Sequence, residues 1–309
     1  MAQKMIIDTD TASDDAVALV LALRDPRVEV LGITVVVGNV EVDKGVQNAL
    51  YTAEMCGAEV PVYRGADRPL MHDFEVAYNV HGEDGMGDIG LPLSGRKPEE
   101  MHGVDAIIES ARAHPGEATL VTLGPLTNLA LALRKDPEIA SLFKKVVVMG
   151  GTGDHLGNTS PVSEFNIWVD PEAAAMVFAA GLPLVMVGWD ISRKYATFFD
   201  NDVAALRAVS PLGQFCMDIQ RQLTIFCEEV TKLDSLFDQP DPITMAIAIE
   251  PDIGTEVVHR HVAVETTGEL ARGMTIVDHL EATGQAPNTH VVLAANRDRF
   301  LEMLTEACR

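Results

Sequence analysis

Residues 5–16 read Met-Ile-Ile-Asp-Thr-Asp-Thr-Ala-Ser-Asp-Asp-Ala and place four aspartates within eight positions. The apolar run Met5-Ile6-Ile7 predicts a short buried strand, and the apolar residues 16–23 predict a helix. The aspartates therefore lie in a strand-to-helix loop, and in an open α/β sheet such loops form the edge where ligands bind. Because carboxylates packed this closely repel one another, the loop indicates a site where a cation holds them together.

Two motifs of known chemistry fit this loop incompletely. An EF-hand calcium loop needs oxygen ligands at its first, third and fifth positions, and Ala12 occupies one of these whether the loop starts at Asp8 or at Asp10. The signature of haloacid-dehalogenase-type phosphatases would use Asp8 as nucleophile and Asp10 as acid, with Ala12 in place of its Thr or Val. A metal-dependent phosphatase of this type stays an alternative, although it gives Asp14 and Asp15 no role.

The spacing Asp-Thr-Asp-x-x-x-Asp-Asp-Ala over residues 8–16 resembles the N-terminal signature of the nucleoside hydrolases, which cleave the N-glycosidic bond of ribonucleosides. Later segments agree with the same family in order along the chain: Gly38-Asn39, the strand end and glycine turn at 122–128, the ribose-binding stretch at 158–173, and Asp241-Pro242 ahead of the apolar run 243–249. The resemblance therefore covers residues 5–250.

The resemblance implies a calcium site and the residues that hold it. It assigns Asp10, Asp15, Asp241 and the backbone carbonyl of Leu123 to Ca²⁺, and it makes Asp10 the general base that takes a proton from a calcium-bound water. Asp8 has no contact with the ligand in this scheme and supports the loop from beneath. The resemblance also implies a sugar and base site formed by Asp14, Asn39, Met149, Asn158, Glu164, Phe165 and Asn166.

The chemistry of these groups agrees with such a reaction. Carboxylates and a carbonyl suit a hard, oxygen-preferring ion such as calcium. Such an ion can hold both hydroxyls of a vicinal diol and acidify a water, whose proton a nearby carboxylate accepts. Anionic groups under the sugar stabilise the oxocarbenium-like ribosyl group that forms when an N-glycosidic bond breaks. We therefore expect hydrolysis of ribonucleosides to ribose and free base.

One departure from the family concerns the leaving base. Many members have a histidine that protonates or stacks on the base, but here Pro240 precedes Asp241 and has no proton to donate. His81 is the candidate replacement, because imidazole titrates near neutrality, and it lies in a glycine-rich segment at 71–95 that resembles the family's mobile loop. We expect this segment to fold over the active site. The base preference stays open, and a non-catalytic, calcium-dependent nucleoside or ribose binder is a second alternative.

Composition narrows the expected partners and location. The net charge of −23 would repel the phosphates of nucleic acid and favours a neutral or cationic ligand such as a nucleoside. No apolar stretch approaches the length of a membrane span. Four cysteines without paired spacing predict free thiols in a reducing, cytoplasmic compartment. The family resemblance implies a homodimer or homotetramer.

Strands and helices alternate along the chain, which predicts a single α/β domain over residues 1–309. Apolar, mostly valine-rich runs predict strands at 5–8, 29–37, 60–63, 118–123, 145–149, 183–188, 256–265 and 289–294. Helices are predicted at 14–24, 42–56, 103–113, 126–134, 171–180, 211–233 and 296–307. The alternation indicates an open, mostly parallel, doubly wound sheet with helices on both faces and the active site at the carboxyl edge of the strands.

Overall fold

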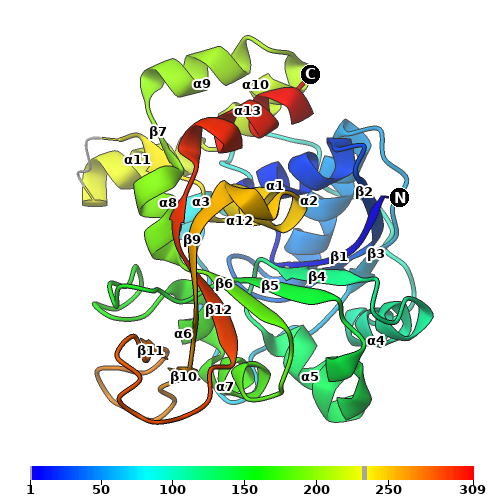
Figure 1. Cartoon of the computed structure of the whole chain (residues 1–309). Coiled ribbons are helices and arrows are strands. Elements are labelled where there is room, and N and C mark those ends of the chain that lie inside the picture. Colours follow the sequence, from blue (N-terminus) through cyan, green and yellow to red (C-terminus); the bar gives the residue numbers. More distant parts are fainter. Residues whose placement is uncertain (1, 232–234) are drawn as a thin grey trace.

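The computed structural model describes residues 2–231 and 235–309. At its centre is an eight-stranded sheet in the order β3-β2-β1-β4-β5-β6-β12-β9, in which every neighbouring pair is parallel except β12 and β9 (Figure 1). Its strands are β1 (Gln3–Thr9), β2 (Val28–Val35), β3 (Val62–Arg64), β4 (Thr119–Thr122), β5 (Lys145–Met149), β6 (Leu184–Val187), β9 (Gly254–Arg260) and β12 (Thr289–Ala295).

The helices and the smaller strands complete the described chain. The helices are α1 (Ser13–Arg24), α2 (Val42–Met55), α3 (Tyr78–His81), α4 (Gly103–Ala113), α5 (Thr127–Lys135), α6 (Phe165–Val169), α7 (Pro171–Phe178), α8 (Trp189–Tyr195), α9 (Asp200–Arg207), α10 (Pro211–Asp218), α11 (Arg221–Phe226), α12 (Pro240–Ile249) and α13 (Arg297–Ala307). Two-stranded sheets form from β7 (Thr197–Phe198) with β8 (Phe237–Asp238), and from β10 (Val262–Val264) with β11 (Thr275–Val277).

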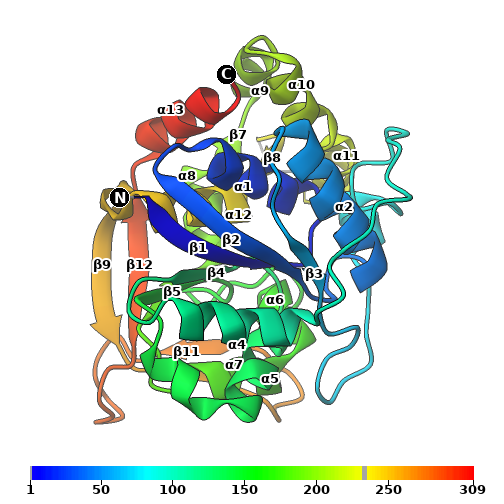
Figure 2. The same ribbon diagram turned by 90° about the vertical axis from the view of Figure 1, so that its right-hand side faces the viewer.

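Helices cover both faces of the central sheet (Figure 2). Helices α1, α2, α12 and α13 pack on one face around a core that includes Ile7 and Leu19. Helices α4, α5 and α7 pack on the other face around Ile6 and Leu120. Since successive residues of a strand point to opposite faces, Ile7 packs in the first core and Ile6 in the second. The predicted single-domain, doubly wound α/β fold is confirmed.

Helix α1 is buried along most of its length and fixes the loop that precedes it. Every residue from Ser13 to Ala22 is buried, because α1 lies between the sheet, α2 and α12. A helix that is apolar on all sides needs such a place in the interior. The aspartate loop between β1 and α1 is therefore held at both ends by elements of the core.

Two sequence predictions differ from the structure. The predicted helix 211–233 is broken into α10, α11 and a π-helical turn, Cys227–Thr231, and its last two residues lie outside the described chain. The break follows Ile219, which is buried, and the Gln220 side chain then donates to the carbonyls of Ser13 and Cys216. The predicted strand 256–265 is likewise two strands, because β9 pairs with β12 whereas β10 pairs with β11.

The segment 71–95 is more ordered than its sequence indicates. It contains α3, and Met86 is fully buried. Asn48 of α2 donates to the carbonyl of Asp84 at 2.9 Å, and Lys44 donates to that of Glu83 at 2.8 Å. The middle of the segment is therefore attached to α2. Within the described residues, no helix is long and apolar enough to cross a membrane.

Candidate active site

The candidate site lies at the carboxyl edge of β1, β2, β4 and β5, where the sequence places it. Asp10 follows β1, Asn39 lies beyond β2, Leu123 follows β4 and Met149 ends β5. These four strands lie side by side in the sheet, in the order β2-β1-β4-β5. Residues separated by more than a hundred positions therefore meet around the aspartate loop.

Asp10 is held in a tight backbone cradle. The Asn39 N–H donates to Asp10 Oδ2 at 2.6 Å, and Asp10 Oδ1 is buried without a partner. The turns at Gly38 and Gly124 enclose the same carboxylate, because a Cβ added at Gly38 would overlap it and one added at Gly124 would lie 2.8 Å from Oδ1. Burial, and then the charge of Asp15, raises the pKa of Asp10 well above its ordinary value.

We expect the Gly38→Ala substitution to displace the Asp10 carboxylate and to lower the rate of the catalysed reaction about 10- to 100-fold, by analogy with other changes that misplace a reacting group by about 1 Å. The fold should persist, because the clash is confined to one side chain. Gly254→Ala is the matched control, since the nearest atom to an added Cβ there lies 3.4 Å away. Steady-state rates of both variants test the cradle; equal rates would contradict it.

Three further carboxylates gather beside Asp10. Ligand oxygens of Asp14, Asp15 and Asp241 all lie within 4.8 Å of one another, and all three residues are buried. Asp15 is fixed by Thr9 Oγ1, which donates to Oδ1 at 2.5 Å, and by the Ala12 N–H, which donates to Oδ2 at 2.9 Å. Burial raises the pKa of Asp15 to about 7, and burial followed by the charge of Asp15 raises that of Asp241.

The carboxylates of Asp10, Asp14, Asp15 and Asp241, which we call the carboxylate cluster, together fit a divalent cation. Asp14 Oδ1 and Asp10 Oδ1 are buried and have no hydrogen-bond partner. Within the described residues, neither lysine nor arginine forms an ion pair with Asp10, Asp14, Asp15 or Asp241. Buried negative charges require compensation, and a hard cation with oxygen ligands supplies it.

Asp8 lies under the loop and is bound by neighbouring side chains. Thr34 Oγ1 donates to Asp8 Oδ1 at 2.5 Å, and Asn128 Nδ2 donates to the same oxygen at 2.8 Å. Burial raises the pKa of Asp8 to about 7. The Leu123 N–H also donates to the Asp8 carbonyl at 2.7 Å, so Asp8 joins the ends of β1 and β4. These contacts match the supporting position expected for it.

Asn166 links Leu123 to Met149. Its Nδ2 donates to the Leu123 carbonyl at 2.7 Å and lies 3.3 Å from the Met149 carbonyl and 3.2 Å from its Sδ. A carbonyl oxygen has two lone pairs, so the hydrogen bond leaves one lone pair of Leu123 for another ligand. The structure thus brings together three residues that the sequence assigns to different roles, the metal, the sugar and the base.

Glu164 and Asn158 shape the predicted sugar-binding stretch through backbone contacts. Glu164 is buried and caps α6. Its carboxylate accepts from the N–H of Asn166, in the first turn of α6, and from the N–H of Gly151, each at 2.8 Å. Burial raises the pKa of Glu164 to about 7. Asn158 is exposed, and its Oδ1 accepts from the Phe165 N–H at 2.9 Å. Both side chains hold the entry to α6 next to Leu123 and Met149.

His81 reaches the aspartate loop from α3. Its Nδ1 lies 2.8 Å from Ser13 Oγ and 3.8 Å from Asp14 Oδ1, and the ring is buried. Burial lowers the pKa of His81, and the charge of Asp14 opposes this shift. The segment 71–95 therefore brings His81 next to the aspartate loop.

Sequence reasoning missed a second polar cluster at the same edge. Asp238, three positions before Asp241, accepts from Ser192 Oγ at 2.5 Å and lies close to the indole of Trp189. Burial, countered by the bond from Ser192 and reinforced by the charge of Asp14, raises the pKa of Asp238 to about 6. The only sequence signal was the short spacing to Asp241.

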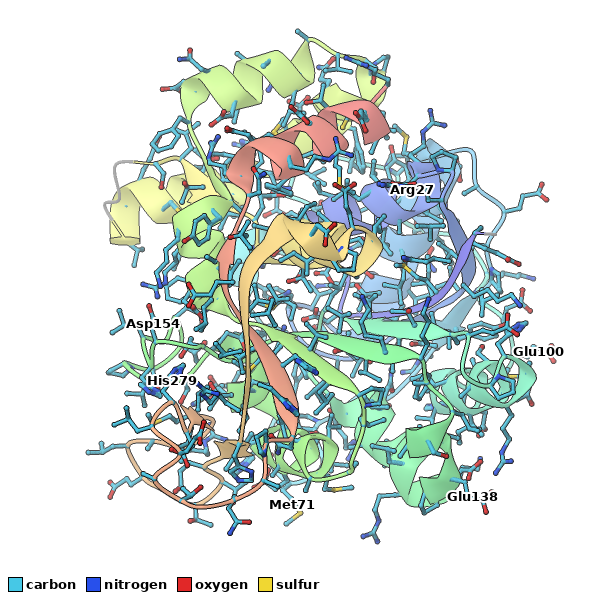
Figure 3. All side chains as sticks on the ribbon, viewed as in Figure 1. Arg27, Met71, Glu100, Glu138, Asp154 and His279 are labelled. Atoms are coloured by element: carbon cyan, nitrogen blue, oxygen red, sulfur yellow. The ribbon has the colours of Figure 1, made fainter. Side chains whose placement is uncertain are left out.

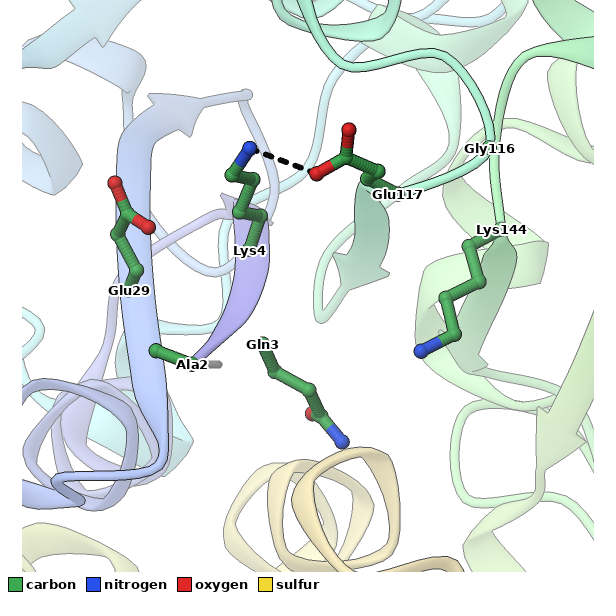
Figure 4. A pocket seen from close by; sticks show the side chains of 7 residues that line it. All are labelled: Ala2, Gln3, Lys4, Glu29, Gly116, Glu117 and Lys144. Carbon is green, nitrogen blue, oxygen red and sulfur yellow. Dashed lines mark hydrogen bonds and ion pairs between the residues drawn. The ribbon is translucent and has the colours of Figure 1, made fainter.

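The surface hollow drawn in Figure 4 lies elsewhere. It is lined by residues at the amino ends of β1, β2 and β5, among them Gln3, Glu29 and Lys144. Lys4 on its wall is paired with Glu117 at 2.8 Å. Because ligands of parallel α/β sheets bind at the carboxyl ends of the strands, this hollow at the opposite edge is not the active site.

The fold and the site define a class of protein: a doubly wound α/β protein with a buried cluster of carboxylates that fits a divalent cation, beside polar groups suited to a sugar. A sequence model described as inosine-uridine preferring nucleoside hydrolase matches residues 5–302. The chain belongs to this nucleoside hydrolase family, whose members are metal-dependent N-glycosidases. Membership favours ribonucleoside hydrolysis over a phosphatase or a non-catalytic binder.

Relatives of known name cover nearly the whole chain. The pyrimidine-specific ribonucleoside hydrolase RihA of Enterobacter sp. (strain 638) is 39% identical over 311 residues, which span 99% of this chain and 97% of that protein. The solved purine-preferring ribonucleoside hydrolase of Gardnerella vaginalis is 32% identical, with a TM-score of 0.91 over 99% of this chain and 98% of that one. The plant nucleoside hydrolase PpNRh1 is 31% identical, with a TM-score of 0.94 over 100% and 99%.

Proposed function

We propose that this enzyme hydrolyses ribonucleosides with a calcium ion held by Asp10, Asp15, Asp241 and the Leu123 carbonyl. The observation that carries this proposal is the buried carboxylate cluster, which has unpartnered oxygens and no lysine or arginine among the described residues paired with it. When bound, calcium would hold the ribose hydroxyls and acidify a water. This set of donors suits calcium better than a soft transition metal.

The side chains of this chain would then divide the reaction among them. Asp10 accepts the proton of the attacking water, because its Oδ1 is free of other partners and its Oδ2 is fixed by Asn39. Asp14 faces the ribose hydroxyls, and the surrounding negative charge stabilises the oxocarbenium-like sugar. Asn39, Asn158, Glu164 and Asn166 orient the sugar, and Met149 and Phe165 line the base side.

We propose that pyrimidine ribonucleosides are the better substrates. The RihA relatives, 39% identical, are named pyrimidine-specific, whereas the purine-preferring relative from Gardnerella vaginalis is 32% identical. In addition, Pro240 removes a group that protonates leaving bases in many family members.

A panel of ribonucleosides assayed for free ribose, with and without a chelator, tests these proposals. We expect chelator-sensitive release from uridine and cytidine, and slower release from inosine and adenosine. Faster release from the purine nucleosides would overturn the base preference alone. Phosphate release from a sugar phosphate would instead support the phosphatase alternative, and binding without turnover would support the non-catalytic binder.

His81 is the proposed proton donor to the leaving base. We expect His81→Ala to lower kcat on the best nucleoside by about 10²-fold, the lower end of what a positioned acid contributes. His72→Ala is the matched control, because His72 lies in the same segment but binds Glu172 at 3.1 Å instead of the aspartate loop. Wild-type turnover in His81→Ala would remove His81 from the mechanism.

We propose that the segment 71–95 closes over the bound nucleoside, with its packed middle moving as one unit. The support is that His81 contacts the aspartate loop while the residues from Met71 to Glu75 include exposed side chains. Hydrogen exchange should slow in this segment when a nucleoside binds. Protection equal to that of the core strands without ligand would contradict the movement.

We also propose that the enzyme acts in the cytoplasm as a homodimer or homotetramer. The four cysteines, Cys56, Cys216, Cys227 and Cys308, are buried and form no disulfide, which suits a reducing compartment. Light scattering at micromolar concentration tests the assembly, and a monomeric mass there would contradict it.

A further inference from the structure

Trp189 lies at the same sheet edge as the carboxylate cluster. It begins α8 directly after β6, whose last residue, Val187, pairs with Met149 at the end of β5. The Trp189 backbone N–H donates to the Gly151 carbonyl at 2.9 Å, and the Gly151 N–H donates to Glu164 at 2.8 Å. Trp189 is thus joined to the turn that Glu164 caps, and its side chain is only half-buried.

The indole of Trp189 is fixed by two charged side chains. The Arg193 guanidinium lies over the ring, 4.6 Å from its centroid. Arg193 is itself held by Asp154, labelled in Figure 3, whose two oxygens accept at 2.9 and 2.8 Å. The Asp238 carboxyl lies close enough to the indole of Trp189 to interact with it. A cation over one face of the ring and a carboxyl near it restrict the orientation of the side chain.

Asp238 connects this aromatic side chain to the sugar end of the site. Its carboxylate accepts from Ser192 Oγ at 2.5 Å and lies close enough to Asp14 for the charge of Asp14 to act on it. Asp14 also lies 3.8 Å from His81. Both side chains therefore lie near the carboxylate cluster that would hold the ribose. His81 is next to Asp14 itself, and Trp189 is next to Asp238, which is close to Asp14.

We propose that the indole of Trp189 forms a wall of the base-binding region, where the planar nucleobase packs against it, and that Asp238 and Arg193 are positioning residues for the ring. The proposal rests on the proposed function, because it takes the ribose to bind at Asp14 and Asp15. Stacking uses the flat face of the base and not the hydrogen-bonding groups on its edge, so an aromatic wall accepts pyrimidines and purines alike.

Fluorescence tests the contact directly, because the chain has two tryptophans. Trp168→Phe leaves Trp189 as reporter, and Trp189→Phe leaves Trp168. Trp168 is a matched control: Arg272 lies over its ring at 4.3 Å, as Arg193 does over Trp189, but Trp168 packs against Gly273. Uridine, inosine and ribose are titrated in the presence of calcium, with the Asp10→Asn substitution added to stop turnover.

We expect uridine and inosine to quench the Trp189 reporter saturably, and ribose to leave its emission unchanged. The Trp168 reporter should respond to none of them. The proposal is overturned if the Trp189 reporter is silent at saturating nucleoside, or if ribose changes its emission as much as a nucleoside does. Saturation is established independently by equilibrium dialysis with radiolabelled uridine.

Steady-state kinetics provides a second test. A purely structural role for Trp189 would not change KM for nucleosides while leaving the inhibition constant of ribose unchanged. Trp189→Ala should raise KM for uridine and inosine by roughly 5- to 150-fold, the affinity that one base–aromatic stack supplies, and Trp189→Phe should retain most of it. The inhibition constant of ribose should stay unchanged in both variants. Asp238→Asn should raise KM less than Trp189→Ala and shift the Trp189 emission maximum.

The outcomes separate this proposal from the proposed function. If no nucleoside releases ribose, the proposed function fails, whereas the fluorescence titration still reports whether a base contacts Trp189. If ribose is released and Trp189→Ala weakens ribose and nucleoside equally, the hydrolase stands and the aromatic wall is wrong.

Discussion

Replacing Asp10 by asparagine is expected to lower ribose release about 10²- to 10⁴-fold, the range that a general base contributes. Asparagine has nearly the same volume, so the cradle of Gly38 and Gly124 still accommodates it, and its carbonyl can still accept from the Asn39 N–H. The lost group is the unpartnered carboxylate oxygen Oδ1, to which the mechanism assigns the proton of the attacking water. Ribose release under saturating uridine measures the effect.

Asp8→Asn is the matched control for this experiment. Asp8 lies in β1, two residues before Asp10, and is equally buried. It receives its hydrogen bonds from Thr34 and Asn128 at one oxygen, which the asparagine carbonyl reproduces. We expect Asp8→Asn to keep activity within several-fold of wild type, because Asp8 does not face the ligand. Full activity in Asp10→Asn, with circular dichroism and calcium binding intact, would sink the assignment of the general base.

Much of the fold follows from local sequence patterns. The apolar runs of β1, β4 and β5 are buried on both faces, and the apolar residues of α1 need a place in the interior. The alternation of strands and helices was therefore sufficient to predict a doubly wound sheet. The prediction of one helix over 211–233 is wrong, and at the break between α10 and α11 the Gln220 side chain donates to the carbonyl of Ser13, 207 residues away. No local pattern contains such a contact.

The same distinction applies to the site. The aspartate loop carries its own signal, since four carboxylates in one strand-to-helix turn require compensation. The cradle around Asp10 depends on glycines that follow two other strands, and the link from Asn166 to Leu123 joins residues 43 positions apart. Trp189 and Asp238 come close because α8 leads into β7, which pairs with β8. Neither residue belongs to the motifs that resemble the family.

Removing calcium is expected to destabilise the protein, and to do so more strongly at pH 7.5 than at pH 5. Burial raises the pKa of Asp15 to about 7 and those of Asp10 and Asp241 above their ordinary value. An acid whose pKa is higher in the folded chain than in the unfolded chain contributes its full stability below about pH 4, and this contribution is lost as the pH rises through the folded pKa. The metal-free protein should therefore lose stability between about pH 4 and pH 7.

Calcium should restore what deprotonation removes, because it takes the place of protons on the carboxylates. At free calcium about 100 times Kd, binding adds about 2.7 kcal/mol to the free energy of unfolding, or roughly 5 °C in Tm for a chain of this size. Differential scanning calorimetry with calcium and with a chelator, at pH 5 and pH 7.5, measures both effects, and Asp241→Asn serves as the variant that lacks one ligand. A calcium-induced rise in Tm that is equal at the two pH values, or equal in Asp241→Asn and wild type, would place the ion away from these carboxylates. A rise that grows with pH and shrinks in the variant would mean that the charges which destabilise the empty loop are the same charges that bind the metal.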